Sequence, residues 1–437
     1  MKKTSLLLMF LLAFLTLPGQ VLYEELPSMP EPVSNNAVTA AVANGATYVY
    51  SFCGLDSSKL WSGIHLKAWR MNMSSGIWEA LPPVPDPEGG KIAAAASTVK
   101  NRIYVIGGYH VAQNGSETSS DKVHRFDPAS NSWLSDGAPL PKAIDDHVQA
   151  VWSDSLIYVI TGWSNITNVP DVQIYNPAGN VWLDGTDVPN NVNYKVFGAS
   201  GVIIGDTIFY CGGAAAGINF PASSFFRIGI IDPGNPAQIN WSGFSSADAK
   251  GYRMAAATQN STAVWIGGSD VTYNYNGIAY NGSGGVPALA RRKLYQPATG
   301  TLVNENTNAL PAIMDLRGAA QIDLTRFVTA GGMENGQKVS NRVFLYNPDG
   351  SVGTGSPTDP AVFTVYPNPV ADNLSIDCAG SKAVQVILYD VYGRTGSSVS
   401  GTCPLTLPVT QLAPGIYLLQ VLSAERQVWS GKILIAR

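Results

Sequence analysis

The chain has 437 residues, 27 of them basic and 31 acidic, and its formal net charge is −4 at pH 7. A nucleic-acid-binding protein needs a basic face to displace counterions from phosphates, so this mildly acidic composition argues against that class. Only 13% of the residues are charged, whereas 44 are glycine, 28 are proline and 10% are aromatic. This composition favours an all-β protein with short strands and tight turns.

The N-terminus predicts export. Residues 1–3 (MKK) are followed by an apolar run from Leu6 to Leu17 that ends at Pro18-Gly19. A short basic segment, an apolar segment of this length and small residues after it are typical of a secretory signal peptide. The run is too short to span a bilayer. We therefore expect residues 1–19 to be removed after signal-peptide-dependent export to the periplasm, and we expect no transmembrane segment.

A repeated pattern occupies residues 20–350. Six times, an apolar β run ends in a pair of small residues, which lets the backbone approach a neighbouring strand without a Cβ clash. The pairs are Cys53-Gly54, Gly107-Gly108, Thr161-Gly162, Gly212-Gly213, Gly267-Gly268 and Gly331-Gly332. A third run then ends in an Asx-Pro turn, as at Asp127-Pro128, and a fourth opens with tryptophan at Trp78, Trp133, Trp182 and Trp241.

This pattern resembles the kelch repeat, and six copies imply a six-bladed β-propeller. The copies depart from the pattern at Cys53 and Thr161, which replace glycines, and at Leu302, which replaces the tryptophan of the fifth blade. The sixth repeat stops at residues 347–348 without a fourth strand, whereas residues 23–28 (YEELPS) resemble a fourth strand without a blade. We predict that this N-terminal strand completes the last blade and removes an exposed sheet edge.

Signatures of catalysis and of metal binding are missing from the sequence. None of the four histidines pairs with another at a spacing that suits a metal, and no hydrolase or phosphate-binding motif occurs. We therefore predict no catalytic residue, no metal and no cofactor. Cys53 and Cys211 are expected to be buried small hydrophobic residues, whereas Cys378 and Cys403 share the small C-terminal segment and could form a disulfide after export.

The segments that enter the inner strands of the propeller carry many of its few charges. Aromatic residues follow the small-residue turns of the second and third blades. The candidate ligand-binding residues, which would surround the central channel on the top face, are Lys91, Tyr109, His110, Asp145, Asp146, Trp163, Lys195, Arg253 and Arg317. The basic residues would hold an anionic or polyhydroxylated ligand, and the aromatic rings would stack on a sugar. Alternatively, the basic residues bind carbonyls between blades and the rings belong to the core.

Residues 351–361 are rich in Ser, Thr, Gly and Pro and predict a linker. The short alternating strands of residues 362–437 then resemble the C-terminal sorting domain of the type IX secretion system of Bacteroidota. The matching residues are Tyr366, Pro367, Asn368 and Pro369, then Gly393 and Arg394, and finally Gly415 and Lys432. The resemblance implies a small β-sandwich that the type IX secretion machinery recognises before the cargo is attached to the outer cell surface.

We therefore expect a secreted, surface-attached kelch propeller that binds a glycan or a protein and catalyses no reaction. The alternative is a carbohydrate-active enzyme on the same scaffold, similar to the kelch sialic-acid epimerases or mutarotases. A deep pocket that holds a carboxylate with a raised pKa would favour the enzyme. A purely structural surface component would show no pocket, and the fold alone separates none of these functions.

Overall fold

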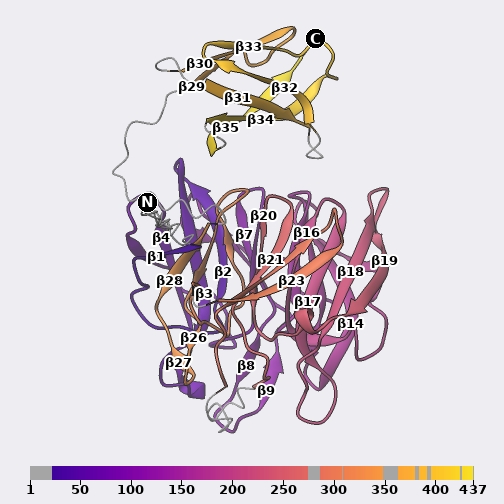
Figure 1. The fold of residues 1–437 in the computed structure, drawn as a ribbon. Helices are drawn as coiled ribbons and strands as arrows, with labels where there is room; N and C mark the ends of the chain where they lie inside the picture. Colours follow the sequence, from indigo (N-terminus) through magenta and orange to yellow (C-terminus); the bar gives the residue numbers. More distant parts are fainter. Residues whose placement is uncertain are drawn as a thin grey trace, which may run out of the picture. The chain divides into compact units, whose positions relative to one another are not determined.

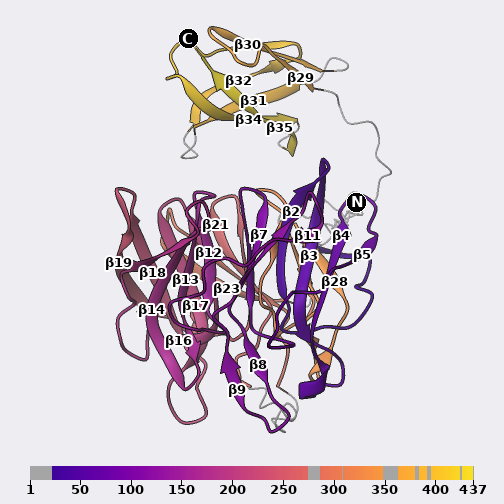
Figure 2. The same ribbon diagram turned by 180° about the vertical axis from the view of Figure 1, so that it is seen from behind.

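The computed structural model describes residues 22–273, 286–307, 309–347, 363–378, 383–390, 395–423 and 426–436. The predicted signal peptide, the predicted linker and the predicted sorting residues Gly393 and Arg394 lie outside the described residues, as do the side chains of Cys378 and Lys432. The chain forms two compact units, Met1–Val352 and Gly353–Arg437 (Figures 1 and 2).

Six antiparallel sheets of four strands make up the first unit. Blade 1 contains β2 (Ala37–Ala43), β3 (Ala46–Leu55), β4 (Ile64–Asn72) and β5 (Trp78–Leu81). Blade 2 contains β6 (Ala95–Val99), β7 (Arg102–Ile106), β10 (Val123–Asp127) and β11 (Ser132–Trp133). Blade 3 contains β12 (Val148–Trp152), β13 (Leu156–Ser164), β14 (Thr167–Asn176) and β15 (Val181–Gly185).

The other three blades have the same order. Blade 4 contains β16 (Val196–Ile204), β17 (Thr207–Ala215), β18 (Phe225–Asp232) and β19 (Asn235–Ser245). Blade 5 contains β20 (Ala255–Gln259), β21 (Thr262–Ile266), β22 (Arg291–Gln296) and β23 (Thr301–Asn306). Blade 6 contains β24 (Ala320–Gln321), β25 (Phe327–Ala330), β28 (Val343–Tyr346) and β1 (Tyr23–Leu26). The predicted all-β propeller is confirmed.

Two hairpins project from one face of the propeller, the lower face in Figure 1. They are β8 (Tyr109–Val111) with β9 (Glu117–Ser119), and β26 (Met333–Glu334) with β27 (Lys338–Val339). The small-residue turns belong to the same face. We call it the top face of the propeller, although Figure 1 draws it at the bottom. The described helices are two short 3₁₀ turns, η1 (Trp61–Gly63) and η2 (Ala247–Ala249).

The N-terminal strand closes the ring as predicted. Strand β1 pairs antiparallel with β28 along its whole length, from Tyr23 opposite Tyr346 to Leu26 opposite Val343. The last blade therefore contains strands from both ends of the repeat region, and β28 is not an exposed sheet edge.

A ring of backbone hydrogen bonds surrounds the propeller axis. Each blade has one residue with a left-handed backbone at or just before the start of its inner strand: Asn35 (φ 56°), Ala93 (58°), Asp146 (48°), Gly198 (66°), Arg253 (46°) and Asp315 (60°). The Asn35 N–H donates to the Asp315 carbonyl at 3.1 Å, and the Asp146 N–H donates to the Ala93 carbonyl at 3.1 Å. The Gly198 N–H donates to the Asp146 carbonyl at 2.8 Å, and the Arg253 N–H donates to the Gly198 carbonyl at 2.9 Å. The N–H of Ala93 donates to Asn35 Oδ1 at 3.0 Å, and that of Leu316 donates to the Arg253 carbonyl at 3.1 Å. The six blades are thereby joined around the axis.

The repeated tryptophans and glycines explain how neighbouring blades fit together. The indole N–H of Trp78, Trp133, Trp182 and Trp241 donates to a carbonyl just after the outer strand of the preceding blade, at 2.8–2.9 Å in each case. A Cβ on Gly267 would lie 2.2 Å from the Ile313 carbonyl oxygen of the next blade, so glycine is needed there. Cys53 and Thr161, which replace such glycines, keep a positive φ of 59° and 44°.

The cysteines of the propeller are buried, as predicted. Cys53 and Cys211 are at most 1% exposed and form no disulfide. Burial raises the pKa of the Cys53 thiol to about 12 and that of Cys211 to about 11, so neither is a reactive thiolate at neutral pH.

The C-terminal unit is a small β-sandwich. One sheet contains β29 (Phe363–Tyr366), β30 (Asn373–Cys378) and β33 (Leu405–Pro408). The other contains β32 (Thr395–Thr402), β31 (Ala383–Tyr389), β34 (Gly415–Ser423) and β35 (Arg426–Ile435). Apolar side chains of both sheets, such as Leu374 and Leu419, form one buried core.

The predicted sorting residues of this unit lie at the ends of strands. Tyr366 ends β29 and its hydroxyl donates to Asp377 at 2.7 Å, and Gly415 begins β34. Asn368 accepts a hydrogen bond from the Leu434 N–H at 2.8 Å, which ties the turn after β29 to the other sheet. Cys403 is buried, but the side chain of Cys378 is outside the described part, so the disulfide stays a prediction.

Deleting residues 23–26 should destabilise the propeller, because β28 would become an unpaired edge and blade 6 would lose its outer strand. We expect a lower urea midpoint and concentration-dependent aggregation. The control is the exposed Glu24→Ala within the same strand, which should change the free energy of unfolding by no more than about 0.5 kcal/mol. A deletion variant as stable and as monomeric as Glu24→Ala would contradict the role assigned to β1.

Candidate functional site

The hydrogen-bonded ring brings a buried ionic cluster to the propeller axis. Arg253 donates from Nη2 to Asp146 Oδ2 at 2.6 Å and from Nη1 to Asp315 Oδ1 at 2.8 Å. Asp315 also accepts from Tyr273 Oη at 3.0 Å and from Ser34 Oγ. Burial disfavours a charged guanidinium, but Asp146 and Asp315 raise the pKa of Arg253 well above its usual range. We call Asp146, Arg253, Asp315 and Arg317 the axial cluster.

Aromatic rings surround this cluster on the top-face side. The Arg253 guanidinium lies 5.1 Å from the ring centre of Tyr252 and 5.4 Å from that of Tyr273. Tyr252 belongs to an apolar cluster contributed by all the blades and containing Tyr109, which is only 3% exposed. The charges are therefore shielded from solvent, which strengthens electrostatic interactions within the cluster.

Several buried polar atoms next to the axial cluster have no hydrogen-bond partner. They are Tyr109 Oη, Tyr252 Oη, Glu117 Oε1, Arg253 Nε and Asn35 Nδ2. Electrostatic coupling places the first three around Arg253, since the charge of Arg253 acts on the pKa of each. An unpartnered buried polar group costs about 1–3 kcal/mol, so such atoms indicate a place where a ligand or water is bound.

Two carboxyl groups beside the cluster have raised pKa values. Burial, followed by repulsion from Asp146, raises the pKa of Asp145 well above its usual range, and Ser119 Oγ donates to Asp145 at 2.6 Å. Burial raises the pKa of Glu117 on the β8–β9 hairpin to about 7, although Arg253 opposes this shift. Glu117 consequently exchanges its proton close to pH 7, and Asp145 keeps its proton to a higher pH than an exposed aspartate does.

Lys91 and His110 belong to a separate buried network in blade 2. Lys91 Nζ lies 2.5 Å from Asp86 Oδ2 and 3.2 Å from His124 Nε2, and His124 Nδ1 lies 2.9 Å from Asp136 Oδ1. Burial alone would raise the pKa of Asp86, but His124 and Lys91 hold it well below its usual range. His110 Nδ1 lies 3.0 Å from the Gly90 carbonyl oxygen. This network anchors the connection between blades 1 and 2.

The predicted ligand-binding residues therefore separate into three groups. The axis brings Asp146, Arg253 and Arg317 together, with Asp145 and Tyr109 beside them. Lys91 and His110 lie in the blade-2 network, where Lys91 Nζ also approaches the Gly107 carbonyl of the same blade at 3.5 Å. Because Tyr109 is buried, it offers its hydroxyl rather than an open ring face.

Trp163 and Lys195 are the partly exposed members of the predicted set. Trp163 makes edge contacts with Phe197 and Phe220, each at a centroid distance of 5.6 Å. Lys195 contributes its backbone carbonyl to Asn168 at 3.4 Å. Sequence reasoning missed Asp315, Tyr252, Tyr273 and Glu117. Asp315 could have been found, because it occupies the same position before an inner strand as Asp146 and Arg253.

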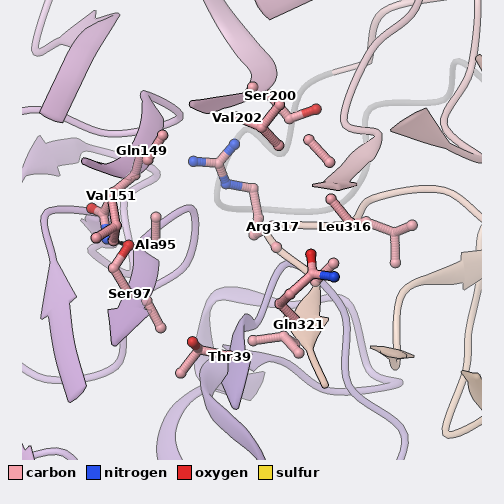
Figure 3. A pocket seen from close by; sticks show the side chains of 18 of the residues that line it. Thr39, Ala95, Ser97, Gln149, Val151, Ser200, Val202, Leu316, Arg317 and Gln321 are labelled. Carbon is pink, nitrogen blue, oxygen red and sulfur yellow. Dashed lines mark hydrogen bonds between the residues drawn. The ribbon is translucent and has the colours of Figure 1, made fainter. Parts of the chain in front are cut away.

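A cavity of about 410 Å³ lies along the axis on the other side of the cluster (Figure 3). The inner strands of all six blades form its wall, and the Arg317 guanidinium points into it. Among the described residues, no group of three or more His, Cys, Asp or Glu side chains could hold a metal ion.

The comparisons with known proteins agree with this architecture. Residues 364–436 match the model of the secretion system C-terminal sorting domain, and residues 93–135 match that of the kelch motif. Kelch-like protein 26 of Danio rerio is 28% identical over 126 residues, which are 29% of this chain and 20% of that protein. Kelch-like protein terF of Aspergillus terreus is 25% identical over 220 residues, which are 48% of this chain and 45% of that protein. The chain thus spans less than half of these relatives.

A solved structure, that of YjhT, matches 73% of this chain and 95% of its own chain with a TM-score of 0.56 and 17% identity. At this identity the likeness shows the fold alone. Together these findings identify a kelch-type β-propeller joined to a C-terminal sorting domain, which is a module of exported proteins. Helices in the described part of the chain are too short to cross a bilayer.

Replacing Arg253 by methionine should destabilise the propeller by about 3–5 kcal/mol, because Asp146 and Asp315 would stay buried without their shared cation. Urea unfolding followed by tryptophan fluorescence measures the change. Arg292→Met is the matched control, because Arg292 pairs with the half-exposed Glu305 and its loss should cost less than about 1 kcal/mol. Equal losses in the two variants would show that the axial ion pairs are not required for stability.

Glu117→Gln should change how stability depends on pH. In the wild type, the folded state keeps the Glu117 proton up to about pH 7, whereas the unfolded state loses it near its ordinary pKa of 4.5. Wild-type stability therefore falls with rising pH through this window, and the glutamine variant escapes this loss. The stability difference should be smallest below pH 4.5, grow up to pH 7 and then stay constant. A pH-independent difference, like that expected for the exposed Glu24→Gln, would contradict the buried proton.

Proposed function

We propose that this protein is a secreted kelch propeller that binds a sugar, or another polyhydroxylated group, at the top-face side of the axial cluster. The supporting observation is the set of unpartnered buried atoms at Tyr109, Tyr252, Glu117 and Arg253. The set contains both donors and acceptors. A hydroxyl group donates and accepts, so a polyol satisfies the whole set, whereas a carboxylate can only accept.

The surroundings of these atoms favour the same ligand class. Tyr252, Tyr273, Phe197 and other apolar residues form a shared cluster next to the polar atoms. Sugar-binding sites combine apolar surface with a few well-placed polar groups in this way. Tyr109 lies on β8 and Glu117 on β9. The proposed site is therefore next to the hairpin that projects from the top face, which Figure 1 draws at the bottom.

The C-terminal domain supports a role outside the cell. We infer that the type IX secretion machinery recognises this domain after signal-peptide-dependent passage into the periplasm, and that the propeller then works at the outer cell surface. There it would bind a glycan of the surroundings or of a partner glycoprotein. This inference rests on the match of residues 364–436 to the sorting domain.

An enzyme acting on a carbohydrate is the second candidate, and one observation favours it. Glu117, with a pKa of about 7, and Asp145, whose pKa burial raises well above its usual range, both lie within electrostatic reach of Arg253. A carboxyl group with a pKa near neutrality can both donate and accept a proton during turnover, as the opening of a sugar ring in a mutarotase requires. The ligand class would be the same, and chemical turnover would be added to binding.

Tyr252→Phe should weaken sugar binding about tenfold, because it removes one unpartnered hydroxyl and leaves the ring in place. A glycan array with the full-length mature protein would select the ligand, and calorimetry would measure its affinity. Tyr158→Phe is the matched control, because it removes a hydroxyl that bonds to the Pro236 carbonyl away from the axis. Failure of the folded wild type to bind any glycan would overturn the proposal.

The same sugars can be followed by proton NMR to detect exchange between anomers. Catalysed exchange that Glu117→Gln abolishes would establish the enzyme, and binding without exchange would establish a recognition module. Glu24→Gln, at an exposed position of β1, is the control for the loss of one carboxylate.

A further inference from the structure

The axial cavity is a channel that is blocked at one end by the axial cluster. Its wall runs from Arg317 and His147, which are 6% and 1% exposed, to the exposed Gln321 near the hairpin turns of the face opposite the top face. The wall consists of small apolar residues and of uncharged polar ones. The polar ones are Thr39, Ser97, Thr98, Gln149, Ser200, Thr258 and Gln321. Of the described residues that line the cavity, Arg317 alone has a fixed charge.

A local irregularity of blade 6 directs Arg317 into this channel. In blade 5, Ala257 lies opposite Val264, and in blade 6 the corresponding pair is Ala320 and Val328. In blade 5, Ala257 comes four positions after Arg253, whereas in blade 6 Ala320 comes five positions after Asp315. Blade 6 therefore has one extra residue before this pair. The extra residue lies before β24, outside the ladder that β24 forms with β25, and it changes the direction of the side chains between Asp315 and Ala320 relative to the other blades.

The residue after Arg317 shows how the chain accommodates this insertion. Gly318 has a φ of +147°, and a Cβ on it would lie 2.7 Å from the Val38 carbonyl oxygen of blade 1. This conformation therefore requires glycine at position 318, because any other side chain would collide with the neighbouring inner strand. The sequence Arg317-Gly318 supplies both the cation and the backbone that aims it.

The Arg317 guanidinium keeps donors available for a ligand. Its Nη2 donates to the His147 carbonyl at 2.9 Å, and its Nε lies 3.5 Å from Asp146 Oδ1 without a hydrogen bond. No described residue accepts from Nη1. Figure 3 shows the guanidinium pointing into the cavity between Gln149 and Ser200. Burial and the nearby Arg317 lower the pKa of His147 to about 4, so His147 is neutral and adds no second cation.

We propose that this channel is a second binding site, separate from the sugar site, and that it takes a small organic carboxylate whose oxygens accept hydrogen bonds from Arg317. A guanidinium offers parallel N–H donors that fit a carboxylate. One cation with Asp146 close behind it matches a monoanion better than a phosphate or sulfate, which carries more charge. The hydroxyl and amide groups of the wall would bind a hydroxylated remainder of the ligand.

The test titrates the full-length mature protein with sodium acetate and sodium gluconate by calorimetry, at an ionic strength held constant with sodium chloride. We expect saturable binding, tighter for gluconate, and a loss of affinity of about tenfold or more in Arg317→Gln. Arg102→Gln removes an exposed arginine at the start of β7 and should bind like the wild type. Ala96→Leu narrows the channel while Arg317 itself is kept, and it should also weaken binding. If Arg317→Gln does not fold, the Ala96→Leu variant still tests the proposal.

Several results would overturn the channel site. They are the absence of saturable carboxylate binding by the folded wild type, unchanged affinity in Arg317→Gln or Ala96→Leu, and equally tight binding of sulfate. The proposal does not rest on the sugar site, and Tyr252→Phe separates the two. Tyr252→Phe should keep the carboxylate affinity of the wild type. If Tyr252→Phe lost this affinity, the anion would bind at the top face instead.

Discussion

The closed ring of hydrogen bonds at the axis determines how the rest of the propeller is arranged. Each blade contributes one residue in the left-handed conformation, and its N–H or carbonyl bonds to the next blade. For residues other than glycine this conformation is unfavourable, and it persists because the neighbouring blades fix it. The strand β1 is part of the same constraint, since a ring closes only if the last blade is complete. The six ring residues consequently surround one axis.

This geometry makes the ring residues a natural place for function. Ala93 and Gly198 show that the backbone position accepts a small side chain or none, so the fold does not require charge there. Buried ion pairs are often no more stabilising than well-packed apolar residues. Arg253 with its two carboxylate partners is therefore explained poorly by stability alone. The unpartnered atoms of Tyr109, Tyr252 and Glu117 beside it, together with Arg253 Nε, support the polar ligand that we propose.

The sequence predicted the architecture well because its signals are local and repeat. The small-residue pairs, the outer tryptophans and the unpaired segment 23–28 each correspond to a contact between neighbouring blades, and closure followed from them. Most of the site depended on distances that no repeat reveals. Lys91 and Arg253 both precede an inner strand, yet Lys91 turns to Asp86 in the connection between blades 1 and 2, whereas Arg253 reaches across the axis to Asp146 of blade 3. Arg317 was found by position, but its direction depends on one inserted residue.

The axial cluster divides the space along the axis into two chemically different parts. Towards the top face, donors and acceptors are mixed among tyrosines and carboxyl groups with raised pKa values, which suits the neutral hydroxylated ligand that we propose. Towards the other face, one guanidinium meets a wall without another fixed charge, which suits an anion. Asp146 is the side chain that both parts share, because it accepts from Arg253 and lies 3.5 Å from Arg317. Changing Asp146 would disturb both parts together, whereas Tyr252 and Arg317 each act on one part, so the two sites are separable despite their common charge.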